Sequence, residues 1–315
     1  MKLRPVLIWS GQIILAVLVI RFLGRTVVTN WSELSDLNVA LRLRPGWILL
    51  AAVIIWVTYG LLVTAWRWIL GGWGQRLPFG RAAQIWCLSN LGRYLPGKIW
   101  SIAGLAVLSQ RAGVVGWAAA ASAVAMQVLA VGTGAVIVAL SAPGAASPVL
   151  DLVGIPPTAA PILLGTAGVV ALATVTGLTL EPLSAAAGRA AGPKFQLRAL
   201  PLRTVVAAGA TTLVSWLAYG VAFWFLARGL FGAGDLTVQS AVGVFAAGYI
   251  VGLLALFVPG GVGVRELVFL ALLSPVLGPR GALALTIASR LLLTGTEVSA
   301  ALLTLGLRAD QGGSS

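Results

Sequence analysis

Six charged side chains lie within the apolar stretches of this sequence, and their chemistry limits what the chain can do. Four are cations and two are carboxylates: Arg93, Lys98, Arg265, Arg290, Glu266 and Glu297. A charge at the centre of a bilayer costs about 2.5–3.5 kcal/mol on insertion scales, so six unpaired charges would cost on the order of 15 kcal/mol. These groups must therefore pair or face water. Four cations against two carboxylates leave a positive surplus, which the phosphate of a ligand would neutralise.

The spacing of these charges limits how they can pair. Arg290 and Glu297 are seven residues apart and share one face of a helix, but about 10 Å separates them along its axis. Each therefore needs a partner from elsewhere in the chain. We expect Glu266 to pair with Arg290. For Glu297 the expected partner is Arg93 or Lys98. Glu266 and Glu297 would then form a charge switch, because each could change partner or take up a proton.

Two segments that combine proline with glycine interrupt the apolar runs beside these charges. The first break falls at Pro96 and Gly97, inside segment 82–110, and the second begins at Pro259, inside segment 238–277. Proline cannot continue a helix. Broken backbone at bilayer depth is tolerated only where it is buried in protein or lines a cavity. Two such interruptions, one in each half of the chain, indicate a transporter binding site.

The residues around the two breaks are suited to holding an anion. Lys98 and Arg265 each follow a Pro-Gly break, where a new half-helix would present free N–H groups to a phosphate. Three glycines at the second break would let a head group approach the backbone closely. The expected head-group-binding residues are Asn90, Arg93, Tyr94, Lys98, Gly260, Gly261, Gly263, Arg265 and Arg290.

Structural explanations for the same residues remain open at this point. Glu266 could merely complement a helix N-terminus. Arg93 and Lys98 could extend to the cytoplasmic interface if the first broken segment is shallow. Asn90 and Tyr94 could satisfy freed backbone groups instead of contacting a head group.

Composition identifies the class of protein. Of 315 residues, 59% are hydrophobic and 9% are charged, which is typical of an integral membrane protein. The absence of histidine excludes His-based metal sites and Ser-His-Asp catalysis, and we expect no metal or cofactor. Cys87 is the single cysteine, so no intrachain disulfide forms. The 21 basic residues against 8 acidic ones mostly flank apolar runs, which indicates membrane topology and anionic lipid, and no nucleic-acid partner.

The predicted fold is an all-α integral membrane protein. Six stretches are long enough to cross a bilayer as helices: 6–23, 47–70, 116–140, 161–180, 204–228 and 282–307. The two broken segments lie between them. The connection 141–160 has no basic residue and marks the midpoint, which divides the chain into a first membrane repeat at 1–150 and a second at 151–308. The tail 309–315 is expected to be disordered.

Charge distribution favours broken segments that enter and leave on one side of the membrane. With the N-terminus cytoplasmic and both segments re-entrant, ten basic residues lie inside and five outside: Lys2, Arg4, Arg76, Arg81, Arg111, Arg189, Lys194, Arg198, Arg203 and Arg308, against Arg25, Arg42, Arg44, Arg228 and Arg280. Full crossing would place most of them outside, against the positive-inside rule; a kinked span in each place is the alternative. Re-entrance predicts an inverted repeat in the cell membrane, with both termini cytoplasmic and the two breaks meeting near the midplane.

The two broken segments resemble those of a known family. The relevant residues are Asn90, Arg93-Tyr94-Leu-Pro96-Gly97-Lys98 and Arg111-Ala-Gly113, then Pro259-Gly-Gly-Val-Gly-Val-Arg265-Glu266 and Arg290. This pattern is similar to that of the lysylphosphatidylglycerol synthase transmembrane-region family, which includes the flippase domain of the bacterial multiple peptide resistance factor. Phe257 stands where the family often has a proline. In that family a separate soluble domain transfers aminoacyl groups, and this chain has no room for one, so we do not expect a synthase.

The resemblance and the charges together predict a flippase-like lipid transporter and not an enzyme. The expected partner is an anionic phospholipid or a polyprenyl-phosphate-type lipid. One alternative is a membrane-embedded enzyme of lipid or polyprenol-linked glycosyl transfer, for which Glu266 and Glu297 alone could supply an acid or a base. Another is an accessory subunit that positions a glycosyltransferase or synthase partner.

Overall fold

The described part of the chain is a bundle of helices. The computed structural model describes residues 43–94, 99–141, 160–177, 199–232, 235–254 and 263–306, with short pieces at 181, 185–186 and 189–190. Within these ranges the regular structure is helical throughout. The helices are α2 (Pro45–Gly72), α3 (Phe79–Asn90), the 3₁₀ turn η1 (Leu91–Tyr94), α4 (Ile99–Arg111), α5 (Gly116–Ser141), α7 (Ala160–Gly177), α9 (Leu202–Phe231), α10 (Val238–Leu254) and α11 (Val264–Gly306).

Four of these helices are long and apolar enough to cross a membrane. They are α2, α5, α9 and α11, of which α2 has a mean hydropathy of 2.4 over its most apolar window. They contain the predicted spans 47–70, 116–140 and 204–228, and all but the last residue of 282–307. Helix α7 covers most of the predicted span 161–180, and its remaining residues lie outside the described part, as does the predicted span 6–23. The chain is therefore a multi-pass membrane protein.

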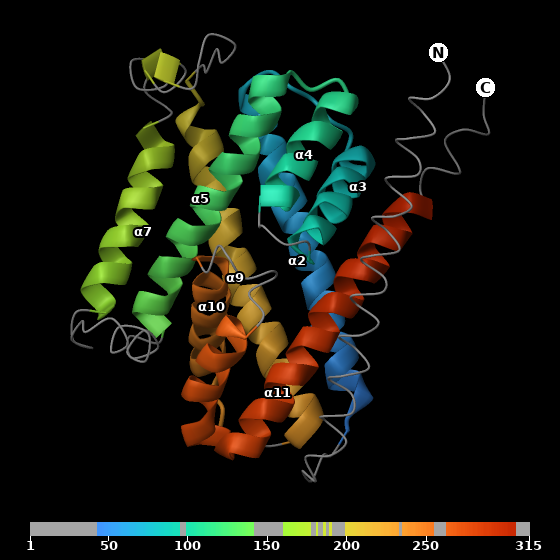
Figure 1. Cartoon of the computed structure of the whole chain (residues 1–315), viewed down its shortest axis with the longest axis vertical. Helices are drawn as coiled ribbons and strands as arrows, with labels where there is room; N and C mark the ends of the chain where they lie inside the picture. The colour runs from blue at the N-terminus through green and yellow to red at the C-terminus, as the bar shows by residue number, and fades with distance from the viewer. Residues whose placement is uncertain are drawn as a thin grey trace.

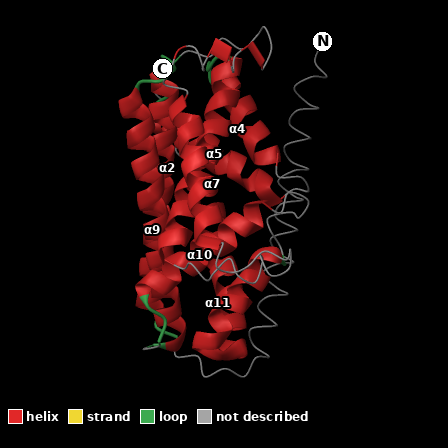
Figure 2. Cartoon of the chain, turned by 90° about the vertical axis from the view of Figure 1, so that its left-hand side faces the viewer, coloured by secondary structure: helices red, strands yellow, loops and turns green. Residues whose placement is uncertain are grey.

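Helices α3 and α4 are too short to cross a bilayer. Helix α3 has 12 residues and α4 has 13, which correspond to about 18 and 20 Å, against a hydrocarbon core of about 30 Å. Figures 1 and 2 place α4 in the upper half of the molecule, and α3 packs beside it. A Cβ atom on Gly92 would lie 2.9 Å from the backbone carbon of Trp100, so only glycine lets η1 approach α4 this closely.

The helices are interrupted in both segments where breaks were expected. The first leaves α-helical geometry at Leu91, ahead of the predicted break at Pro96 and Gly97, which lie outside the described residues. In the second, α10 ends at Leu254 and α11 begins at Val264, directly after Gly263 at φ +84°. Pro259, Gly260 and Gly261 also lie outside the described part. Helix α10 and the start of α11 occupy the lower half of the view in Figure 1.

Helix α11 differs from its prediction because it joins the end of the second broken segment to the last span. It runs from Val264 to Gly306 with a single non-helical residue, Gly278, at φ 70° and ψ 162°. Pro275 and Pro279 flank this residue, and each removes a backbone donor. The chain therefore bends sharply, and in Figure 1 α11 descends to the lower end and then rises to the upper right. Residues 264–277 are called the first leg below and residues 279–306 the second leg.

Two apolar clusters fill the interior of the bundle. One is centred on α9, α10 and α11, where Phe223, Phe245 and Phe269 are in mutual contact with ring centroids 5.1–6.3 Å apart. The other is centred on the second half of α2 with α3, α4 and α5, and includes the fully buried Trp66. Helix α2 contributes to both clusters. Each broken segment is thus held by its own apolar cluster.

Candidate functional site

The carboxylate of Glu297 is buried, and the first broken segment supplies its partners. Arg93 Nη1 lies 2.7 Å from one carboxylate oxygen, and the Tyr94 hydroxyl donates to the other at 2.6 Å. Only 7% of the Glu297 side chain is exposed. The 3₁₀ turn η1 allows two consecutive side chains to reach α11 together. Both carboxylate oxygens are therefore engaged by residues about 200 positions away in the sequence.

Further contacts of Arg93 and Tyr94 join this ion pair to α10 and α11. Arg93 Nη1 also donates to the hydroxyl of Tyr249 on α10, at 2.7 Å. The Tyr94 hydroxyl lies 3.2 Å from Thr294 Oγ1. Thr294 and Glu297 are three residues apart and share one helix face. One compact network, called the Glu297 network below, thus connects both broken segments with the second leg of α11.

All four tyrosines of the chain gather around Glu297. Tyr94 and Tyr249 belong to the network itself. Tyr59 contacts the next residue, Thr296, through hydroxyl oxygens 3.2 Å apart, and Tyr219 packs on Tyr59 with ring centroids at 6.4 Å. Of these four, only Tyr94 was identified from the sequence. The available signal was position, because Tyr59 and Tyr219 lie near the middle of long helices and not at the interface that tyrosine usually prefers.

Glu266 forms the second ion pair at the start of α11. Its Oε1 atom lies 2.6 Å from Arg290 Nη1, and its Oε2 atom accepts a hydrogen bond of 2.7 Å from the backbone N–H of Gly263. A carboxylate three residues into a helix that reaches back to the first free N–H is half of a capping box. In this pair 22% of the glutamate side chain and 13% of the arginine side chain are exposed. This set is called the Glu266 site below.

The bend in α11 explains why Glu266 meets Arg290. Both residues lie twelve positions from Gly278, one on each leg. When a helix folds back on itself, residues equally distant from the bend come together. The fold-back also brings Arg265, thirteen positions before Gly278, close to Ser289, eleven positions after it, with Nη2 donating to Oγ at 3.1 Å. The pairing of Glu266 with Arg290 was expected, but the bend that produces it was not.

Among the described members of the charged set, Arg265 is the cation without an ion-pair partner. The described residues form two ion pairs, and neither includes Arg265. Its guanidinium lies over the Phe269 ring at 5.1 Å from the centroid. Its Nε atom is buried and has no hydrogen-bond partner within the described part of the chain. Three arginines against two carboxylates leave one positive charge beside the Glu266 site.

Several sequence-predicted site residues are brought together and others cannot be placed. The expected pairing of Glu266 with Arg290 is confirmed. Of the two partners expected for Glu297, Arg93 and Lys98, the structure shows Arg93. Asn90 is the last residue of α3. Lys98, Gly260 and Gly261 lie outside the described residues. The partners that sequence reasoning missed are Tyr249, Thr294 and Ser289. The predicted roles in head-group binding and charge switching stay predictions.

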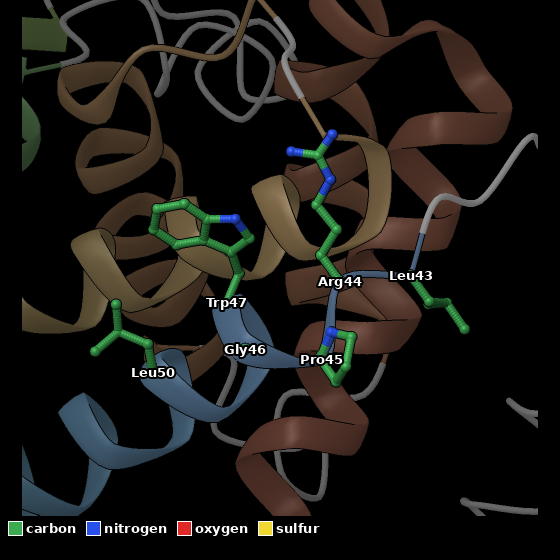
Figure 3. A pocket seen from close by; sticks show the side chains of 6 residues that line it. All are labelled: Leu43, Arg44, Pro45, Gly46, Trp47 and Leu50. Carbon is green, nitrogen blue, oxygen red and sulfur yellow. The ribbon is translucent and has the colours of Figure 1, made fainter.

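A shallow hollow with a volume of about 600 Å³ lies elsewhere, at the start of α2. Figure 3 shows the six side chains that line it: Leu43, Arg44, Pro45, Gly46, Trp47 and Leu50. Trp47 stacks on Phe225 with ring centroids 5.1 Å apart. Trp47 precedes Tyr59 by twelve residues, or about 18 Å along a helix, so the hollow is remote from the Glu297 network. A tryptophan at the end of a span is typical of the membrane interface.

Comparisons with known proteins give one result. The family model described as "Lysylphosphatidylglycerol synthase TM region" matches residues 6–296, which is nearly the whole chain. Among curated proteins no match is found. Within the described residues, no group of three or more Cys, Asp or Glu side chains is placed to hold a metal ion.

Proposed function

We propose a function from the premise that this chain belongs to the lysylphosphatidylglycerol synthase TM region family. The chain is a multi-pass membrane protein whose family indicates a lipid-related role. Its proposed activity is flippase-like transport, in which an anionic phospholipid or a polyprenyl-phosphate-type lipid moves between leaflets.

The observation that carries this proposal is the surplus charge at Arg265. Burying an unpaired cation at membrane depth is costly, yet Arg265 lies beside an ion pair with a buried, unpartnered Nε atom. A neighbouring helix N-terminus adds to the positive potential. A lipid phosphate at this place would neutralise the charge and accept hydrogen bonds from the guanidinium. Arg265, Arg290 and Gly263 are the described residues that would hold it.

The proposed architecture is an inverted repeat of two re-entrant segments. Support comes from the short helices: α3 and α4 lie at the upper end of the bundle, while α10 and the first leg of α11 lie at the lower end (Figure 1). In this arrangement residues 1–150 and 151–308 form the two repeats, and six spans surround the two broken segments. The proposed location is the cell membrane, with both termini cytoplasmic. Broken segments that approach from opposite leaflets would bring their charges together near the midplane.

The two ion pairs suit a carrier that alternates between leaflets. Each pair joins the second leg of α11 to a residue beside the break in one of the two broken segments. Breaking and re-forming one pair would let that segment move relative to the last span. No nucleotide-binding motif is found in the sequence, so the proposed driving force is an ion gradient or the concentration difference of the lipid itself.

The state of the two carboxylates supports transport over catalysis. Glu266 and Glu297 are each held by an arginine at 2.6–2.7 Å. A general acid or base must instead reach the proton that it transfers. We therefore propose that the chain is not an enzyme.

Lipid translocation in vesicles tests the proposal. The purified full-length chain is reconstituted into phosphatidylcholine vesicles with a trace of fluorescent phosphatidylglycerol, and dithionite quenches the outer label. The chain is expected to expose the inner label, which protein-free vesicles protect. Arg265→Gln removes one charge-assisted contact to the phosphate and is expected to slow translocation roughly tenfold.

A matched control is Arg228→Gln, because Arg228 stacks on Trp224 at 4.6 Å near the end of α9 and makes no contact with the Glu266 site. Translocation by Arg228→Gln is expected to equal that of the unaltered chain. Product formation by the purified chain would instead support the enzyme. If translocation is absent and only a partner glycosyltransferase or synthase loses activity in the variants, the accessory role is correct.

A further inference from the structure

Glu266 occupies the hydrogen-bond donors that an anionic head group would use. One of its oxygens takes the Gly263 N–H at 2.7 Å and the other takes Arg290 Nη1 at 2.6 Å. Helix N-termini and arginine forks are the donors that bind phosphate in proteins. We propose that Glu266 is a specificity-determining competitor of the lipid phosphate, which restricts the site to singly charged phosphodiester head groups. This inference rests on the lipid-transport function proposed above.

Exchange of Glu266 for a phosphate is physically possible because the carboxylate is accessible and held by few partners. Its side chain is 22% exposed, against 7% for Glu297. Its partners are one backbone N–H and one arginine. A carboxylate and a phosphodiester carry the same single charge and accept hydrogen bonds at similar lengths. The head group can therefore replace Glu266 without leaving Arg290 unpaired.

An additional contact with Arg265 would favour the phosphate over Glu266 in this exchange. Its guanidinium donates a hydrogen bond to Ser289, the residue next to Arg290. The guanidinium of Arg265 therefore lies at the position of the second leg that adjoins Arg290. The buried Nε atom of Arg265 has no described partner while Glu266 holds the site. A phosphodiester has two charged oxygens, like a carboxylate, and two further ester oxygens that are weaker acceptors. It can therefore take the two donors held by Glu266 and also engage Arg265.

The net charge of these three side chains determines whether a phosphodiester or a phosphomonoester is favoured. Arg265, Arg290 and Glu266 together carry one net positive charge. A phosphodiester brings one negative charge and makes the occupied site neutral. A phosphomonoester brings a charge of about −1.5 to −2 at pH 7 and leaves excess negative charge at membrane depth. A phospholipid such as phosphatidylglycerol is therefore favoured over a polyprenyl monophosphate.

Competition by Glu266 also explains how Arg290 stays paired in an empty carrier. When the lipid leaves, the carboxylate returns to Arg290 and the helix N-terminus. The affinity for lipid is thereby lowered, and release becomes faster. Removing the carboxylate should tighten binding and slow turnover, whereas loss of a purely structural residue would not improve binding.

The test is a binding titration with soluble lipids. The purified full-length chain in detergent is titrated by calorimetry with dihexanoyl phosphatidylglycerol, dihexanoyl phosphatidic acid and inorganic phosphate. The unaltered chain is expected to bind the phosphodiester more tightly than the monoester phosphatidic acid and more tightly than inorganic phosphate. Glu266→Gln is expected to bind phosphatidylglycerol roughly tenfold more tightly and to gain still more affinity for phosphatidic acid.

Two variants test whether competition by Glu266 is the cause of the change in lipid affinity. Glu266→Asp keeps the charge and is expected to keep the preference for the phosphodiester. Asp235→Asn makes the same charge change at an exposed turn between α9 and α10, and is expected to leave both affinities unchanged. If Asp235→Asn tightens binding as much as Glu266→Gln, general electrostatics and not competition is responsible, and the proposal is wrong.

Other outcomes are equally decisive. Unchanged or weaker lipid binding by folded Glu266→Gln overturns the competition. If that variant does not fold, the unaltered chain still decides, because tighter binding of phosphatidic acid than of phosphatidylglycerol overturns the selectivity. Inorganic phosphate bound as tightly as phosphatidylglycerol overturns the lipid assignment. Tighter lipid binding by Glu266→Gln, together with no vesicle translocation by the unaltered chain, supports the competition and refutes transport.

Discussion

The Glu297 network and the Glu266 site use the same pair of chemical groups in different surroundings. In both, an arginine meets a glutamate at 2.6–2.7 Å next to a broken helix. Glu297 is closed in by Arg93 and Tyr94, and Tyr249 holds the arginine. Glu266 is three times more exposed and is held by one side chain and one backbone N–H. We therefore propose that the first network holds the fold together and that the second can exchange its partner for a ligand.

The burial of the carboxylate explains this difference, because the arginines differ in the opposite sense, with Arg93 27% and Arg290 13% exposed. A buried charge that loses its partner has no water to replace it, and the resulting loss of stability is large. A partly exposed charge can be solvated when the pair opens, so opening costs less. Identical ion pairs can therefore serve as a fixed contact in one place and as an exchangeable contact in another.

The largest expected effect comes from removing Arg93. Arg93→Ala leaves the Glu297 carboxylate buried without its cation, and we expect a loss of about 3–5 kcal/mol of unfolding free energy. Thermal unfolding of the purified chain in detergent measures this as a lower melting temperature. The double variant with Glu297→Ala removes both charges and should be less destabilised than Arg93→Ala alone. Equal losses would show that Arg93 acts through packing and not through the ion pair.

A smaller loss is expected when the Glu297 network loses one hydroxyl. Tyr94→Phe removes the 2.6 Å hydrogen bond to the carboxylate and keeps the ring. Because hydrogen bonds to charged groups contribute about 1.5–3 kcal/mol, the loss of unfolding free energy should fall in this range. Tyr249→Phe removes the other hydroxyl contact, that of Arg93, and is the matched comparison. Should both variants unfold like the unaltered chain, the network would not be the fixed contact described above.

Opening the Glu266 site is expected to cost less than breaking the Glu297 network. Arg290→Ala leaves Glu266 with its backbone partner and partial access to water, so a loss of about 1–2 kcal/mol is expected. The melting temperature should therefore lie between those of Arg93→Ala and the unaltered chain. Equal destabilisation by Arg290→Ala and Arg93→Ala would remove the distinction between the two pairs.

The smallest effect is expected at Ser289. Ser289→Ala removes the hydroxyl that accepts from Arg265 at 3.1 Å, and a hydrogen bond of this kind contributes about 0.5–1.5 kcal/mol. The same unfolding measurement checks this value. A loss as large as that of Arg93→Ala would indicate that Arg265 is a structural residue and would weaken its assignment as the ligand-binding cation.

The need for ion pairs could be predicted without the structure, because the cost of burying a charge depends on the residue and its apolar neighbours in the sequence. Arg290 and Glu297 are too far apart along one helix to pair, so each had to find a distant partner. Glu266 was expected for Arg290, whereas the partner of Glu297 stayed open between Arg93 and Lys98. The gathering of all four tyrosines around Glu297 could not be predicted in the same way, since Tyr59, Tyr219 and Tyr249 lie in apolar runs with no partner nearby in the sequence. Their contacts depend on how α2, α9 and α10 pack together.

The sequence by itself determined that this is a helical membrane protein, that helices break within segments 82–110 and 238–277, and that its buried charges pair. These properties follow from hydropathy, from proline and glycine, and from the cost of charge in a bilayer, all of which act over a few residues. Only the tertiary structure decided which carboxylate is enclosed, which is accessible, and that Arg265 is left over. Those outcomes depend on the bend at Gly278 and on contacts between residues about 200 positions apart, which no local pattern contains.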